Sequence, residues 1–194
     1  VNADDQESSK VHCHGLIVRD HPRMTSSWRS EASLHEFLQE HGRSGISGVD
    51  TRSLTHHLRE NGAMNGCLMV GESVSADEAI ALARACEPMQ GQDLACGVST
   101  KEAYEWTGGQ VVIGTTDAPA VVEPKAHVVC IDFGVKRNML RILVSLGCRV
   151  TVVPAQSQIE EVLSLNPDGV LLSNGPGDPE PCRYAIQLVA DLLE

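Results

Sequence analysis

Basic residues are few in this chain, and they are scattered along it. The 194 residues contain 15 Lys and Arg against 26 Asp and Glu, which gives a net charge of -11. Nucleic acids and anionic lipid surfaces both select for clusters of Lys and Arg. The charge balance therefore argues against either as a direct partner and leaves small molecules or another protein.

Long apolar runs are also missing. No stretch approaches the length that a helix needs to cross a bilayer, and no charged-then-apolar leader opens the chain. Apolar residues nevertheless make up 42% of the composition, which is ordinary for a protein that buries a core. We expect a soluble globular protein without a membrane partner.

The cysteines form no recognisable pattern. There are seven, an odd number, and no two are spaced as C-x-x-C, so neither a disulfide framework nor a zinc ribbon is indicated. His12 and His14 share one face of a predicted strand, but no third ligand lies nearby, so no metal site is expected. The pattern favours reduced thiols in the cytoplasm.

Residues 1–114 are expected to form one mixed α/β domain, because helix and strand signals occur there without regular alternation. Three helices are indicated by apolar spacing that follows an N-capping residue, with Ser30 or Ser33, Asp50 and Ser75 as the caps. The expected elements are a strand over 14–20, a helix over 30–42, a helix from Asp50 to Gly62, a turn into a strand over 63–71 and a helix over 75–87.

Residues 115–126 are expected to be a linker, because prolines interrupt them and no apolar period survives. From 127 the pattern becomes regular and predicts a doubly wound parallel sheet, whose ligands bind at the carboxyl ends of the strands. The strands are expected over 127–134, 148–154 and 170–173, and the helices over 136–147, 157–165 and 181–194. On the first of these helices the face toward the sheet is expected to contain Met139, Ile142, Leu143 and Leu146.

The third of these strands runs into "SNGPGDP", residues 173–179. Gly175 and Gly177 lack a Cβ, which lets a ligand approach the main chain, and Pro176 and Pro179 stiffen the loop between strand and helix. Main-chain N–H groups held rigid at 175–177 suit an oxyanion, because donors fixed in advance need no reorganisation as charge develops. From these residues alone, a tight strand-to-helix turn remains the alternative.

Three long motifs closely resemble the small, glutamine-hydrolysing chain of carbamoyl-phosphate synthetase, a class I glutamine amidotransferase. They are "GVDTRSLTHHLRENGAMNGCL" (48–68), "DFGVKRNMLRILVSLGCRVTVVPA" (132–155) and "NPDGVLLSNGPGDPEPCRYAI" (166–186). The N-terminal segments "NADDQESS" and "GLIVRD" are also similar to that family, so the resemblance extends over essentially the whole chain. It implies the N-terminal small-chain domain over 1–114, lacking its start, followed by the first half of a flavodoxin-like amidotransferase domain over 127–194.

The resemblance implies hydrolysis of L-glutamine to glutamate by a Cys-His-Glu triad. The released ammonia passes to a large partner chain, which binds ATP and Mg²⁺ and makes carbamoyl phosphate for arginine and pyrimidine biosynthesis in the cytoplasm. In the family the first glycine of the loop, here Gly175, contacts substrate and oxyanion through its main chain. The second, here Gly177, lies against the bound glutamine.

The triad itself is expected beyond Glu194, so we expect residues 1–194 to be a fragment that does not hydrolyse glutamine alone. A helix macrodipole near Cys182 favours a lower thiol pKa, but no triad partner is identifiable, so Cys182 is interpreted as an ordinary helix-start residue. Two other hypotheses stay open. One is a flavodoxin-like domain that binds a phosphate or flavin at the same loop, and the other is a non-catalytic module that docks on a partner.

Overall fold

The computed structural model describes residues 1–111 and 123–193, and it divides the chain into two compact units. The first unit comprises Val1–Met89 and the second Gln90–Glu194. Among the described residues, no helix is both long and apolar enough to cross a membrane.

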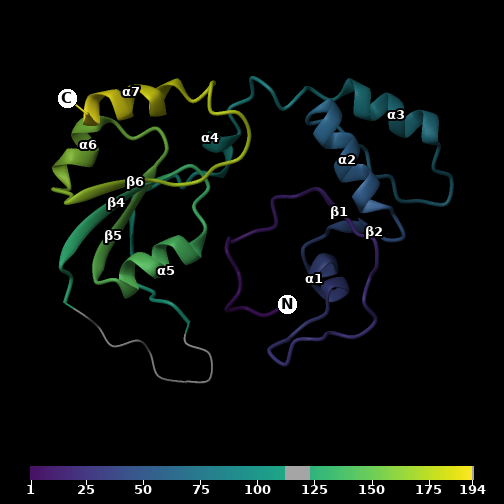
Figure 1. The fold of residues 1–194 in the computed structure, drawn as a ribbon, viewed down its shortest axis with the longest axis horizontal. Helices are drawn as coiled ribbons and strands as arrows, with labels where there is room; N and C mark the ends of the chain where they lie inside the picture. Colours follow the sequence, from purple (N-terminus) through teal and green to yellow (C-terminus); the bar gives the residue numbers. More distant parts are fainter. Residues whose placement is uncertain (112–122, 194) are drawn as a thin grey trace. The chain divides into compact units, whose positions relative to one another are not determined.

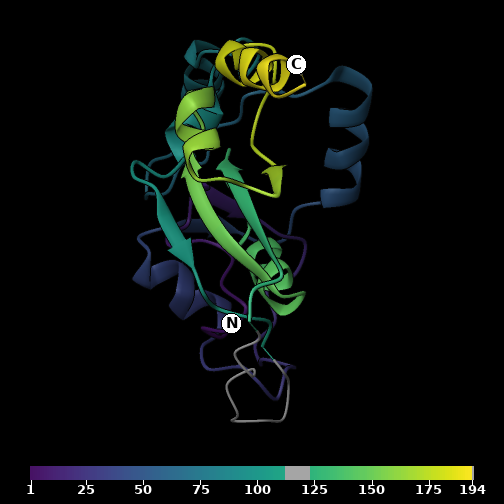
Figure 2. The ribbon, with the colours of Figure 1, turned by 90° about the vertical axis from the view of Figure 1, so that its left-hand side faces the viewer.

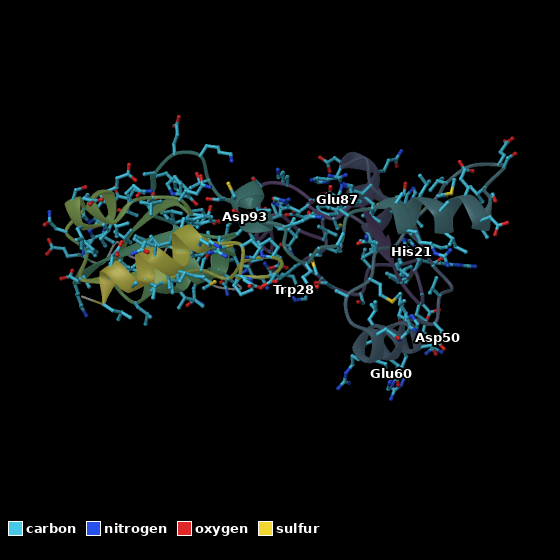
Figure 3. The ribbon with its side chains drawn as sticks, turned by 90° about the horizontal axis from the view of Figure 1, so that it is seen from above. His21, Trp28, Asp50, Glu60, Glu87 and Asp93 are labelled. Carbon is cyan, nitrogen blue, oxygen red and sulfur yellow. The ribbon has the colours of Figure 1, made fainter. Side chains whose placement is uncertain are left out.

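The N-terminal unit contains two short parallel strands and three helices (Figure 1). Strand β1 (Gly15–Ile17) pairs in parallel with β2 (Ser44–Ile46), and the helices are α1 (Leu34–Glu40), α2 (Thr51–Asn61) and α3 (Ala76–Ala85). The predicted helix starts are confirmed, because Ser33, Asp50 and Ser75 each accept a hydrogen bond from a main-chain N–H of the first helical turn. Asp50 is labelled in Figure 3.

The strand predicted over 63–71 does not form. The side-chain amide of Asn65 instead donates to the carbonyl oxygens of Cys86 (2.7 Å) and Glu87 (3.2 Å), just after α3. The segment is thus held to the end of a helix by a side chain, and its own backbone has no strand partner among the described residues. A local side-chain bond of this kind is an alternative to strand pairing that apolar spacing does not reveal.

The C-terminal unit is built on a four-stranded sheet in the order β3-β5-β4-β6. The strands β4 (Ala126–Asp132), β5 (Cys148–Pro154) and β6 (Gly169–Leu172) are mutually parallel and confirm the three predicted strands. The helices between and after them are α5 (Arg137–Ser145), α6 (Ile159–Ser164) and α7 (Arg183–Leu192). The predicted doubly wound arrangement is therefore confirmed.

Alternate residues of the central strands point to opposite faces of the sheet, and each face buries its own core. On one face Val129, Ile131 and Phe133 pack with α6 and α7. On the other, Cys130 and Val152 pack with α5, whose Leu140 is fully buried. Figures 1 and 2 show α6 and α7 together on one side of the strands and α5 on the other.

The inward face of α5 differs from the predicted one. Leu140, Leu143 and Val144 pack on the sheet, whereas Ile142 is 39% exposed and Leu146 is 69% exposed. The polar residues of this helix share one side, and its apolar residues cover an arc of more than half a turn, which is wider than the strip that contacts the sheet, so their spacing did not fix the centre of the buried face. The predicted face was wrong by about one residue of rotation.

Residues 90–111 belong to the C-terminal unit and pack with its four-stranded sheet, whereas the sequence pattern had predicted them in the N-terminal domain. Strand β3 (Tyr104–Trp106) pairs antiparallel with β5, and the short helix α4 (Leu94–Val98) buries Ala95 in the core beside Phe133. Most of the predicted 115–126 linker lies outside the described residues.

Candidate functional site

The loop 173–180 leaves the carboxyl end of β6 and is open to solvent. Gly175, Pro176 and Gly177 are all exposed. The turn 133–136, which follows the neighbouring parallel strand β4, lies directly against it. The carboxyl ends of parallel strands are where open α/β sheets bind their ligands. The loop therefore stands where the sequence predicted it, accessible from outside.

Gly175 fits this position because it has no side chain. A Cβ placed on Gly175 would lie 2.6 Å from the carbonyl oxygen of Phe133 and 2.9 Å from its Cβ. Neither contact is physically tolerable, and the first involves backbone, so the loop or the turn would have to move. The close approach of these two main chains thus requires glycine at 175.

Gly177 is required for a different reason. Its φ is +79°, in the left-handed region that residues with a side chain rarely adopt. A Cβ there would also lie 3.2 Å from Cδ1 of Leu94 in α4. The two glycines thus allow the loop to pack against the turn after β4 on one side and against α4 on the other.

Hydrogen bonds tie the loop to the turn after β4. The Ser173 hydroxyl accepts from the main-chain N–H of Phe133 (2.9 Å), and the Asn174 side chain donates to the carbonyl oxygen of Gly134 (3.2 Å). The Ser173 N–H donates to Ile131 (3.2 Å) and extends the pairing of β6 with β4. Both side-chain and main-chain hydrogen bonds therefore hold the first two residues of the loop in place.

Asp132 holds the turn on which the loop rests. Its carboxylate is 6% exposed and accepts three main-chain hydrogen bonds, from Thr100 (2.7 Å), Gly134 (2.9 Å) and Val135 (2.8 Å). These bonds join the end of β4, the turn after it and the segment between α4 and β3. This role of Asp132 was not predicted from the sequence, because all its partners are backbone groups and one of them, Thr100, lies 32 positions away.

Two main-chain N–H groups in the loop are free to bind a ligand. Gly175 and Gly177 donate to no group among the described residues. Pro176 has no N–H at all, so the expected run of amides at 175–177 is corrected to two separated donors. Main-chain N–H groups without a partner are the kind of donor from which oxyanion holes are built. Whether Gly175 and Gly177 bind glutamine stays a prediction.

The two buried thiols of the second unit, Cys130 and Cys182, are not activated. Burial, with the nearby Asp132 charge as a smaller cause, raises the pKa of the Cys130 thiol to about 12. Burial also raises the pKa of Cys182, whose thiol donates to Oδ1 of Asp93 at 3.6 Å, so the effect expected from the helix macrodipole is outweighed. Neither thiol has the low pKa of a nucleophile.

We therefore expect Cys130 and Cys182 to react with maleimide at pH 8 about 100-fold more slowly than the exposed thiols Cys13, Cys67 and Cys86. Peptide mass spectrometry over time measures each rate. Equal labelling rates at all five positions would contradict the burial of Cys130 and Cys182.

Because the folded state holds the Cys130 proton more tightly than the unfolded chain, the free energy of unfolding should also fall as the pH rises above the ordinary thiol pKa of 9.0.

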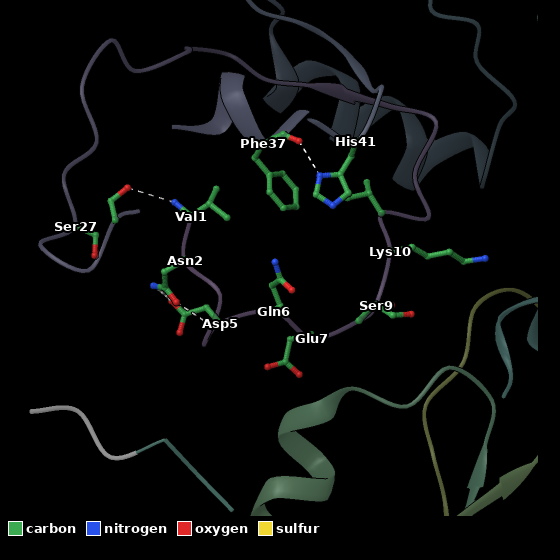
Figure 4. A pocket seen from close by; sticks show the side chains of 13 residues that line it. Val1, Asn2, Asp5, Gln6, Glu7, Ser9, Lys10, Ser27, Phe37 and His41 are labelled. Atoms are coloured by element: carbon green, nitrogen blue, oxygen red, sulfur yellow. Dashed lines mark hydrogen bonds between the residues drawn. The ribbon is translucent and has the colours of Figure 1, made fainter. Parts of the chain in front are cut away.

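Other predicted features fall outside the loop. His12 pairs with the Ser8 hydroxyl at 3.3 Å, and the described part of the chain brings no three metal-ligating side chains together. A pocket in the N-terminal unit is lined in part by Gln6, Phe37 and His41 (Figure 4). It contains none of the residues of the loop.

A family model for class I glutamine amidotransferases matches residues 129–194, which include the end of β4, all of β5 and β6, and the glycine loop. The second unit thus has the sheet and loop of a class I glutamine amidotransferase domain. A second model, described as the CPSase domain of the carbamoyl-phosphate synthase small chain, matches residues 1–68.

Similarity to curated proteins extends over the whole chain. It is 54% identical to the carbamoyl phosphate synthase small chain of Vibrio cholerae over 198 residues, which cover 100% of this chain and 52% of that protein. The small chain of Pseudomonas putida is 52% identical over 98% of this chain and 51% of its own length. The chain belongs to the carbamoyl-phosphate synthase small-chain family and spans about half the length of the curated relatives it matches.

Proposed function

We propose that the protein is the glutamine amidotransferase component of a carbamoyl-phosphate synthase. In this proposal it hydrolyses L-glutamine to glutamate and supplies ammonia to a large synthase chain, which binds ATP and Mg²⁺. We propose further, with the family resemblance as support, that this activity serves arginine and pyrimidine biosynthesis in the cytoplasm. The observation that supports it most is the loop after β6, which exposes two unpaired N–H groups at the carboxyl end of a parallel sheet.

The loop would act on the carbonyl oxygen of the glutamine side chain. When a thiolate adds to the amide carbon, that oxygen becomes negatively charged, and the N–H of Gly175 can stabilise it without moving. Gly177 would contact the bound glutamine before and during the reaction. The thiolate would come from the Cys-His-Glu triad expected of the family and not from the two buried cysteines beside the sheet, because burial raises the pKa values of both.

A chimera tests this function. Residues 1–194 replace the matching half of the Vibrio cholerae small chain, to which they are 54% identical. We expect the chimera to release ammonia from L-glutamine, whereas residues 1–194 alone should not. A chimera that melts cooperatively, binds the Vibrio large chain and yet releases no ammonia would contradict the proposed function and favour a non-catalytic docking module.

A further inference from the structure

Helix α4 lies between the glycine loop and the start of α7, and Asp93 connects them. Asp93 is the N-cap of α4, and its Oδ1 accepts from the main-chain N–H of Cys96 at 3.0 Å. The same oxygen accepts from the Tyr184 hydroxyl (3.1 Å) and from the Cys182 thiol (3.6 Å), both at the start of α7. One carboxylate oxygen therefore fixes α4 to the helix that follows the loop. Figure 3 labels Asp93 at this helix.

Both ends of α4 touch the two turns that form the candidate site. Leu94, next to Asp93, packs against the position that a Cβ of Gly177 would take, with three of its side-chain carbons 3.2–3.5 Å from that position. At the other end, Cγ2 of Val98 lies 3.0 Å from the corresponding position on Gly134. A displacement of α4 would therefore change the packing beside Gly177, because the Leu94 side chain lines this side of the loop.

We propose that Asp93 is a positioning residue for glutamine binding, which acts by holding Leu94 of α4 against Gly177. The inference rests on the proposed function. It assigns a role in the site to the segment 93–98, which the sequence analysis placed in the N-terminal domain. The signal that could have indicated this was an aspartate three residues before Cys96, directly ahead of a short apolar run.

The protonation states of the cluster support this arrangement. Burial raises the pKa of the Tyr184 hydroxyl far above its usual range, with Cys182 and Asp93 as smaller causes. Burial also raises the pKa of the Cys182 thiol. Both groups therefore keep their protons at neutral pH and can donate them to the carboxylate.

The location of the contact predicts which kinetic constant changes. Gly177 would touch glutamine in the ground state and in the transition state alike, so its displacement should raise KM more than it lowers kcat. In the chimera, we expect Asp93→Ala to raise KM for glutamine by about fivefold to tenfold, as for the loss of one or two hydrogen bonds, with kcat within about twofold. Tyr184→Phe should also raise KM, but by a smaller factor, because it removes only one of the hydrogen bonds to Asp93.

Asp93→Asn and Tyr104→Phe are the controls. Asparagine can still place an oxygen against Cys96 and Tyr184, so KM should stay within about twofold of wild type. Tyr104, the other tyrosine of the chain, lies on β3 and its hydroxyl has no hydrogen-bond partner among the described residues, so its substitution should leave KM unchanged. The inference is overturned if Asp93→Ala and Tyr184→Phe leave KM unchanged, or if Asn raises KM as much as Ala does.

A measurement that is independent of activity separates this inference from the proposed function. In ¹⁵N-glycine-labelled chimera without glutamine, Asp93→Ala should move the Gly177 amide resonance, and Tyr104→Phe should not. An unmoved Gly177 resonance overturns the positioning role even if glutamine is hydrolysed. If the wild-type chimera has no glutaminase activity but Asp93→Ala still moves the Gly177 amide resonance, only the proposed function is contradicted.

Discussion

Gly175→Ala is expected to lower the glutaminase kcat of the chimera by about 100-fold or more, the cost of losing one oxyanion donor. The added Cβ would lie 2.6 Å from the carbonyl oxygen of Phe133, so the main chain at 175 has to move away from the turn after β4. An N–H that moves by about 1 Å no longer points at the developing charge. Steady-state kinetics with L-glutamine measure the effect.

Gly169→Ala is the matched control for this substitution. Gly169 is the first residue of β6, the strand that leads into the loop, and a Cβ there would meet no atom within 4 Å. Its kcat should equal that of the unmodified chimera. If Gly175→Ala keeps kcat within about threefold, the N–H of Gly175 does not stabilise the transition state.

Asp132→Ala is expected to destabilise the second unit by about 3–5 kcal/mol, near the upper end for single substitutions. It leaves the buried N–H groups of Thr100, Gly134 and Val135 without their acceptor. Urea unfolding followed by the fluorescence of Trp106, which packs on the sheet, measures the free energy of unfolding.

Asp191→Ala provides the comparison for Asp132. Asp191 accepts one exposed hydrogen bond from Gln187, so its loss should change the free energy of unfolding by less than about 0.5 kcal/mol. Equal urea midpoints for the two variants would show that the three main-chain bonds to Asp132 contribute no net stability.

The regular half of the fold could be predicted because its signals are local. The continuous apolar runs of β4 and β5 indicate strands buried on both faces, and glycines end the segments between them. The N-cap Asp50 was predicted for the same reason, since it bonds within its own first turn, and Ser33 was one of the two caps left open for the first helix. The rotation of α5 could not be predicted to within one residue, because its apolar arc is wider than the strip that contacts the sheet.

The support of the candidate site could not be predicted in the same way. The loop itself was visible as glycines and prolines after an apolar strand, but what holds it comes from distant parts of the chain. Asp132 bonds to Thr100, and Asp93 bonds to Tyr184 across 91 positions. An aspartate with such a role has the same appearance in a single sequence as a solvated one. β3 and α4 were missed because three to five residues are too few to show a period.

The central claim is that two preorganised N–H groups, on Gly175 and Gly177, receive the glutamine side chain. The most direct test is the ¹H–¹⁵N spectrum of ¹⁵N-glycine-labelled chimera, recorded with and without excess L-glutamine. The account predicts that the resonances of Gly175 and Gly177 move on binding, while that of Gly169 at the opposite end of β6 does not. Saturation with glutamine that leaves Gly175 and Gly177 unmoved would contradict it.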